Sequence, residues 1–178
     1  SKTIHVFVAL CDNENQGIVP VPEKLGNGKD PFNNLYWGAA YGVKSYFKNK
    51  TTDWQLVSSP ESGNENILER VLFKHATKDI YLLADAYDGE KIKDGIEDFL
   101  RASNGQLPIK ILHDSRTIEF GGGSDLLAFV GHDGLMDFDV SVNYNQSVSK
   151  AKDVMILACS SQYYFTPEIR GAKAKPLL

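Results

Sequence analysis

Two short apolar runs in this sequence each end close to a side chain that can take part in nucleophilic chemistry. The run at residues 126–130 is followed by His132, and the run at residues 153–157 is followed by Cys159. Unbroken apolar runs of this length are typical of buried parallel strands, and open α/β sheets place their sites just beyond the carboxyl ends of such strands. We therefore expect an imidazole and a thiol at one edge of a sheet, where the imidazole can take the thiol proton and leave a nucleophilic thiolate.

The elements that position these residues can be predicted from the hydrophobic pattern, because short apolar runs indicate strands and apolar residues every three or four positions indicate helices. Strands are predicted at residues 4–10, 54–58, 79–84 and 109–112, the last as a strand or an edge ribbon, and helices at residues 35–47, 64–76 and 88–103. This alternation implies parallel pairing with right-handed crossovers. We expect an α/β fold, a three-layer α-β-α sandwich with a mainly parallel central sheet. After His132, period-two alternation over residues 135–144 predicts a small half-exposed hairpin.

The composition is that of a globular domain. The chain has 178 residues, 42% of them hydrophobic, which is enough for one well-buried core and short for two, so we expect a single domain over residues 1–178. The net charge of −4 argues against nucleic acid as a partner. No run reaches the roughly 18 apolar residues of a membrane span. No signal peptide is recognised; because the chain begins with Ser, a secreted or periplasmic location after signal removal and a cytoplasmic location both stay open, as does the oligomeric state.

The residues around His132 and Cys159 resemble two sequence blocks of a known peptidase family. Residues 129–134, Phe-Val-Gly-His-Asp-Gly, are similar to the His-Gly block of the caspase-hemoglobinase fold, and residues 156–160, Ile-Leu-Ala-Cys-Ser, are similar to its Ala-Cys block. Caspases, legumains, gingipains, metacaspases and separases share this fold. The resemblance implies a caspase-like fold and a cysteine endopeptidase without a cofactor, acting on a peptide or protein substrate. Cys159 would be the nucleophile that forms an acyl-enzyme, and His132 the base.

The resemblance also implies roles for other residues. The family has Gly directly after the catalytic His, and its N–H helps to bind the oxyanion. Here Asp133 stands between His132 and Gly134, so the expected oxyanion donor is a backbone N–H near Gly134 or near Cys159. Asp12, Asp133 and Ser160 are expected to bind substrate, and an acidic pocket at Asp12, just after the first strand, would favour Arg or Lys in the substrate. Family members have further strands and loops after the nucleophile, so we also expect C-terminal elements of the domain to be lacking.

A metal site is one alternative interpretation of the same segment. His132, Asp133, Asp137 and Asp139 offer an imidazole and three carboxylates within eight positions, and such groups suit Zn²⁺ or Mn²⁺. Spacing alone is weak support for a metal site, and we expect no bound metal.

Two further alternatives concern what the fold does. A caspase-like domain without turnover would act as a binding or scaffold protein, because fold similarity does not settle activity. A flavodoxin-like hydrolase or small-molecule binder would leave Cys159 incidental. A disulfide between Cys11 and Cys159 would remove the nucleophile altogether. The geometry discriminates these readings, since a thiol within hydrogen-bond reach of His132 favours the peptidase.

Overall fold

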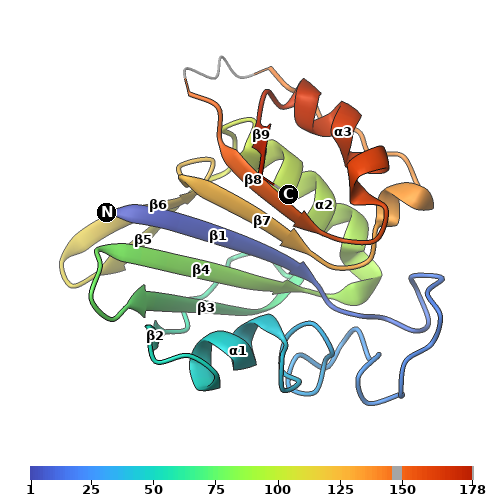
Figure 1. The fold of residues 1–178 in the computed structure, drawn as a ribbon, viewed down its shortest axis with the longest axis horizontal. Helices are drawn as coiled ribbons and strands as arrows, with labels where there is room; N and C mark the ends of the chain where they lie inside the picture. The colour runs from blue at the N-terminus through green and yellow to red at the C-terminus, as the bar shows by residue number, and fades with distance from the viewer. Residues whose placement is uncertain (146–149, 178) are drawn as a thin grey trace.

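The protein has a mixed α/β fold built on one central sheet (Figure 1). A computed structural model describes residues 1–145 and 150–177. Within them, the sheet has seven strands in the order β2-β3-β4-β1-β7-β8-β9. The strands that pair in parallel are β4 (Ile80–Tyr87), β1 (Lys2–Ala9), β7 (Leu126–Val130), β8 (Asp153–Leu157) and β9 (Lys175–Pro176), whereas β3 (Ile67–His75) is antiparallel to β4 and to β2 (Trp54–Ser58). The expectation of a mainly parallel sheet is confirmed.

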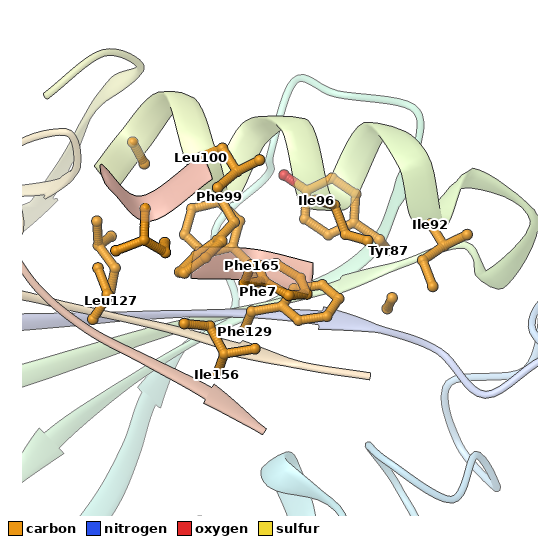
Figure 2. Packing of buried hydrophobic residues seen from close by; sticks show 14 residues of the cluster. Phe7, Tyr87, Ile92, Ile96, Phe99, Leu100, Leu127, Phe129, Ile156 and Phe165 are labelled. Carbon is orange, nitrogen blue, oxygen red and sulfur yellow. The ribbon is translucent and has the colours of Figure 1, made fainter. Parts of the chain in front are cut away.

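One face of the sheet is covered by α2 (Ile92–Ser103) and α3 (Ser161–Gly171). Figure 2 shows this core, in which Phe7 of β1 and Phe129 of β7 lie beneath Phe99 of α2 and Phe165 of α3. All four aromatic side chains are fully or almost fully buried, and each such side chain contributes about 1.5–3 kcal/mol through removal from water. This packing holds the two helices against the strands that lead to His132 and Cys159.

The opposite face is covered over part of its width by α1 (Val43–Asn49) and the segment that precedes it. Alternate residues of β1 and β4, including Val6, Val8 and Ala84, contact the fully buried Trp37 and the partly buried Phe47. The sheet is therefore flanked by helices on both faces. The expected helix at residues 35–47 is corrected to a shorter one, because residues 35–42 form tight turns. A Cβ atom at Gly38 would lie 2.0 Å from the Phe32 carbonyl oxygen, a close approach that only glycine allows.

A separate hairpin of β5 (Pro108–His113) and β6 (Arg116–Gly121) covers another part of the sheet. Its residues Ile111, Ile118 and Phe120 contact Leu72 and Leu83 of the central strands. The predicted ribbon at residues 109–112 is thus confirmed as one strand of a two-stranded sheet, although its partner β6 was not predicted.

The hairpin also covers a buried ionic network. The Arg70 guanidinium donates two hydrogen bonds to Asp85, from Nε to Oδ1 at 2.6 Å and from Nη2 to Oδ2 at 2.7 Å. His5 Nε2 lies 2.9 Å from Asp85 Oδ2, and His5 Nδ1 accepts the N–H of Gly121 at 3.2 Å. Because Nδ1 is an acceptor, the proton of the neutral ring is on Nε2 and is donated to Asp85. The network ties β1, β3, β4 and the hairpin together.

Two predicted elements are wrong. Residues 64–76 were expected to form a helix, but they contain β3, whose consecutive residues Val71, Leu72 and Phe73 are all buried. The β5–β6 hairpin covers one face of this strand, and Trp37 and Phe47 cover the other. A short apolar run of this kind fits the residue spacing of a helix as well as that of a buried strand, and pairing with β2 and β4 determines that it is a strand.

Residues 135–144 were expected to form a hairpin. The segment instead begins within the 3₁₀ turn η2 (Gly134–Met136) and continues without forming a strand. Its alternate apolar residues pack against the core that lies between the sheet and helices α2 and α3.

The other strands and helices that the hydrophobic pattern predicts agree with the structure. The strand at residues 54–58 is β2, the strand at 79–84 lies within β4, and the helix at 88–103 consists of the 3₁₀ turn η1 (Gly89–Lys91) followed by α2. Asp88 begins this element by accepting the N–H of Glu90 with its side chain, as helix-starting residues do.

Candidate functional site

His132 and Cys159 follow two neighbouring parallel strands. The pairing of β7 with β8 ends at Val130 and Leu157, and the N–H of Gly131 still donates to the carbonyl of Leu157 at 3.3 Å. His132 and Cys159 therefore each stand two residues beyond the last pair, at the carboxyl edge of the sheet. The two apolar runs thus bring the imidazole and the thiol to the same edge, as their sequence predicted.

Cys159 lies in the turn between β8 and α3. Its side chain is exposed, and the next residue, Ser160, has the left-handed conformation with φ 54° and ψ 18°. A non-glycine residue in this region is strained and is retained where the surrounding structure requires it. The turn directs the chain straight into α3, so the thiol stands beside the helix N-terminus.

Backbone donors are available next to the thiol. Within residues 1–145 and 150–177, no acceptor takes the N–H groups of Cys159 and Ser160. Gly134, one of the expected oxyanion donors, instead gives its N–H to the carbonyl of His132 at 3.1 Å and is buried. The free donors closest in sequence to the nucleophile are therefore those of the Cys159 turn.

His132 is held by a carboxylate that sequence reasoning considered only as a metal ligand. His132 Nε2 lies 2.7 Å from Asp137 Oδ2, with the imidazole mostly buried and Asp137 exposed. In the neutral ring this contact places the proton on Nε2 and leaves Nδ1 as the base. Among the described residues, no hydrogen bond joins the His132 ring to the sulfur of Cys159. Catalytic hydrogen bonds are often long or misaligned before substrate binds.

Asp133 supports the turn after His132 from below the surface. Its side chain is fully buried, and Oδ1 accepts the N–H of Leu135 at 3.1 Å, which begins η2. Oδ2 has no hydrogen-bond partner among the described residues. Burial raises the pKa of Asp133 above its usual value. The structure thus places Asp133, which was expected to bind substrate, beneath the edge and away from solvent.

Replacement of Asp133 by Asn is expected to change stability in a pH-dependent way. Asn keeps the acceptor for Leu135 but carries no charge. Because the folded-state pKa of Asp133 is raised, its contribution to stability is fully present below the unfolded value near pH 4 and is lost as the pH rises through the folded value. Urea unfolding should therefore show that the free energy of unfolding of the variant, relative to that of the wild type, increases between pH 4 and pH 7 by about 1 kcal/mol. An identical difference at both pH values would contradict this assignment.

Asp12 organises its own loop. Oδ1 accepts the N–H groups of Glu14 and Asn15 at 2.9 and 3.1 Å, and Oδ2 accepts the Asn15 side-chain amide at 2.8 Å. The residue is almost fully buried. Its carboxylate is thus occupied by three local donors, which weakens the expectation that Asp12 provides an acidic pocket for Arg or Lys. Ser160, the third residue expected to bind substrate, is exposed beside Cys159.

Tyr36 interacts with both cysteines. The sequence did not indicate this, because residues 35–47 are predicted to form a helix. Its hydroxyl shares a hydrogen bond with the buried thiol of Cys11, and burial together with the nearby Cys11 and Cys159 thiols raises its pKa. Both cysteines are free, so the considered disulfide is not formed. Tyr36 therefore lies beside Cys11 and near enough to Cys159 for the two groups to interact electrostatically.

Comparison of the chain with protein-family models, curated proteins and solved structures found no match. Across the part of the chain that the structure describes, no three His, Cys, Asp or Glu side chains are grouped so that they could hold a metal ion. His132 and Asp137 meet, but Asp133 and Asp139 do not complete a ligand set with them. Of the helices in the same residues, none has the length and apolar character needed to cross a membrane.

Proposed function

We propose that this protein is a caspase-like cysteine endopeptidase in which Cys159 is the nucleophile and His132 the general base. The observation that carries the proposal is that an exposed thiol and a carboxylate-bound imidazole follow two adjacent parallel strands at the same edge of the sheet. The similarity of residues 129–134 and 156–160 to the His-Gly and Ala-Cys blocks of that family adds support.

The chemistry follows from the side chains present. Nδ1 of His132 takes the Cys159 proton, and the thiolate attacks the scissile carbonyl carbon to form a tetrahedral intermediate. The N–H groups of Cys159 and Ser160 are the donors for its oxyanion, a contribution worth about 10²–10³ in rate per donor. The intermediate collapses as His132 gives the proton to the leaving amine. Water, deprotonated by His132, then attacks the thioester and releases the acid and the thiol.

Asp137 acts as a positioning residue in this scheme. Its contact with Nε2 keeps the other ring nitrogen unprotonated and stabilises the imidazolium that forms during attack. Because Asp137 is exposed, water screens part of this effect. We therefore assign it a smaller contribution than that of a buried carboxylate.

The first test is the rate at which iodoacetamide alkylates Cys159 at pH 7, followed by mass spectrometry in the Cys11→Ser background. His132→Ala should slow alkylation roughly tenfold, because the imidazole no longer takes the thiol proton. Asp137→Asn should slow it less. The matched control is His75→Ala, which removes a histidine from the far end of β3 and should leave the rate unchanged. An equal rate with and without His132 would overturn the proposal.

A noncatalytic binding domain of the same fold is the second candidate function. One observation favours it: in the described residues the sulfur of Cys159 has no hydrogen bond to the His132 ring. An inert Cys159 in the alkylation test would move the assignment to this alternative.

A further inference from the structure

A groove runs beside α3. Its deeper part has a volume of about 540 Å³ and a mainly apolar lining that includes Ile156, Phe165, Ile169 and Leu177. Gln162 and Thr166 line both this part and a shallower hollow bordered by Ser160 and Tyr163. The two hollows therefore adjoin each other along α3, from Ser160 next to Cys159 to Pro176 and Leu177 by β9, and together they are called the groove.

The outer edge of β8 has no strand partner along the part nearest Cys159, where the Ile156 carbonyl accepts a long hydrogen bond of 3.5 Å from the Ser161 hydroxyl. β9 pairs only with Asp153 and Val154 of β8, and the N–H of Leu177 donates to the carbonyl of Val154 at 2.8 Å. From Met155 onward, no described strand lies against this edge. An open strand edge offers backbone donors and acceptors that an extended peptide can use, with its alternate side chains entering neighbouring pockets.

The far end of the groove is basic. Arg170 lines it, and Lys173 and Lys175 flank Ala174, another lining residue. All three cations are exposed, and in residues 1–145 and 150–177 none of them forms an ion pair. The chain as a whole carries a net charge of −4, so this cluster is a local departure from an acidic protein. It complements an acidic group on whatever occupies the groove.

We propose that the groove binds an extended peptide as an added strand on the outer edge of β8. An apolar side chain of the peptide packs on Ile156 and Phe165, and an acidic residue lies against Arg170. Backbone pairing supplies sequence-independent affinity, while the apolar floor and the cation select the side chains. That the bound peptide is a substrate rests on the proposed peptidase function; the binding itself does not.

The test measures binding to the Cys159→Ala protein, which cannot form an acyl-enzyme. The probe is a fluorescein-labelled peptide of alternating Leu and Thr that ends in two Glu residues, and affinity is read from fluorescence anisotropy. Versions with Lys in place of Glu, with Ser in place of Leu, and with N-methylated backbone amides separate the contributions of charge, apolar contact and strand pairing. Each change should weaken binding roughly tenfold.

Two variants locate the bound peptide. Arg170→Glu should weaken binding of the Glu peptide roughly tenfold and improve binding of the Lys peptide. Lys48→Glu is the matched control, since it reverses one exposed charge on α1, on the other face of the sheet, and should have no effect. Thr166→Trp fills the groove without changing charge and should also weaken binding. Thermal unfolding of each variant verifies that the fold is retained.

The outcomes distinguish the groove from the peptidase. Absence of binding at millimolar peptide, or binding that neither Arg170→Glu nor Thr166→Trp changes, overturns the groove proposal. A concentration-dependent dimer in sedimentation that Arg170→Glu abolishes overturns it too, because the occupant would then be a second copy of the chain. If the peptide binds in the groove but the wild type does not cleave it, the groove proposal is supported and the peptidase proposal is rejected. If the wild type cleaves the peptide and Arg170→Glu does not change the rate of cleavage, the peptidase proposal is retained and the groove proposal is rejected.

Discussion

Replacement of Cys159 by Ala is expected to lower kcat/KM for peptide hydrolysis by about 10⁴-fold, and replacement of His132 by Ala by a similar factor. Neither half of the pair has a substitute, since no other described histidine follows a strand at this edge and the second thiol, Cys11, is buried. Because the two groups act as a unit, the double variant should be no slower than either single one. Hydrolysis of a fluorescence-quenched peptide library measures the effect.

Asp137→Asn separates positioning from chemistry in the same assay. The expected result is a drop in kcat of about tenfold with little change in KM, because the carboxylate orients His132 and touches no substrate. His75→Ala should match the wild type. Hydrolysis that persists in the Cys159→Ala protein would show that another group is the nucleophile.

Asp85→Ala is expected to destabilise the fold by about 3–5 kcal/mol at pH 7, because it leaves the buried Arg70 guanidinium without its counterion. Arg70 is 6% exposed and Asp85 is fully buried, so water cannot replace the lost partner. The double variant Arg70→Met with Asp85→Leu should recover most of the loss, since an apolar pair of similar size is tolerated where a lone charge is not. Urea unfolding of the three proteins measures this.

The same network predicts the direction of acid sensitivity. Burial alone would raise the pKa of Asp85, but the hydrogen bonds from Arg70 and the adjacent His5 bring it below the usual value. A depressed folded-state pKa means that the stabilisation is present above the unfolded value near pH 4 and is lost as the pH falls through the folded value. The gap between wild type and Asp85→Ala should therefore narrow only in strong acid. A gap that is already closed at pH 5 would contradict this network.

The sequence predicts the strands that precede His132 and Cys159 better than it predicts some of the elements around them. The apolar runs before His132 and Cys159 form strands, although the second is only partly buried, with Leu157 exposed. Two parallel strands that are neighbours place the residues that follow them at the same edge of the sheet. Whether these strands were neighbours could not be read from local pattern, because pairing is a long-range property. The misassigned β3 shows the same limit, since its apolar residues fit a helix until β2 and β4 are known to lie on either side.

The remaining site features depend on contacts that local sequence does not encode. Asp137 meets His132 only because η2 turns the chain back after Asp133. Tyr36 reaches the two thiols only because tight turns replace the predicted helix before α1. The sequence shows three aspartates shortly after His132. The turn of the backbone at η2 determines that Asp137 is the one that contacts the His132 ring.

The β5–β6 hairpin forms no hydrogen-bonded ladder with any described strand of the central sheet. It is held by side-chain packing and by the Gly121 N–H bond to His5. Detachment of this hairpin from the central sheet therefore breaks few backbone bonds, and only its own ladder then protects it, so its amides should exchange with solvent faster than those of β1 and β4, which pair with a strand on each side. Each such opening would admit water to His5 and Asp85, so a fully buried ion pair lies beneath a part of the fold that few backbone bonds attach to the sheet.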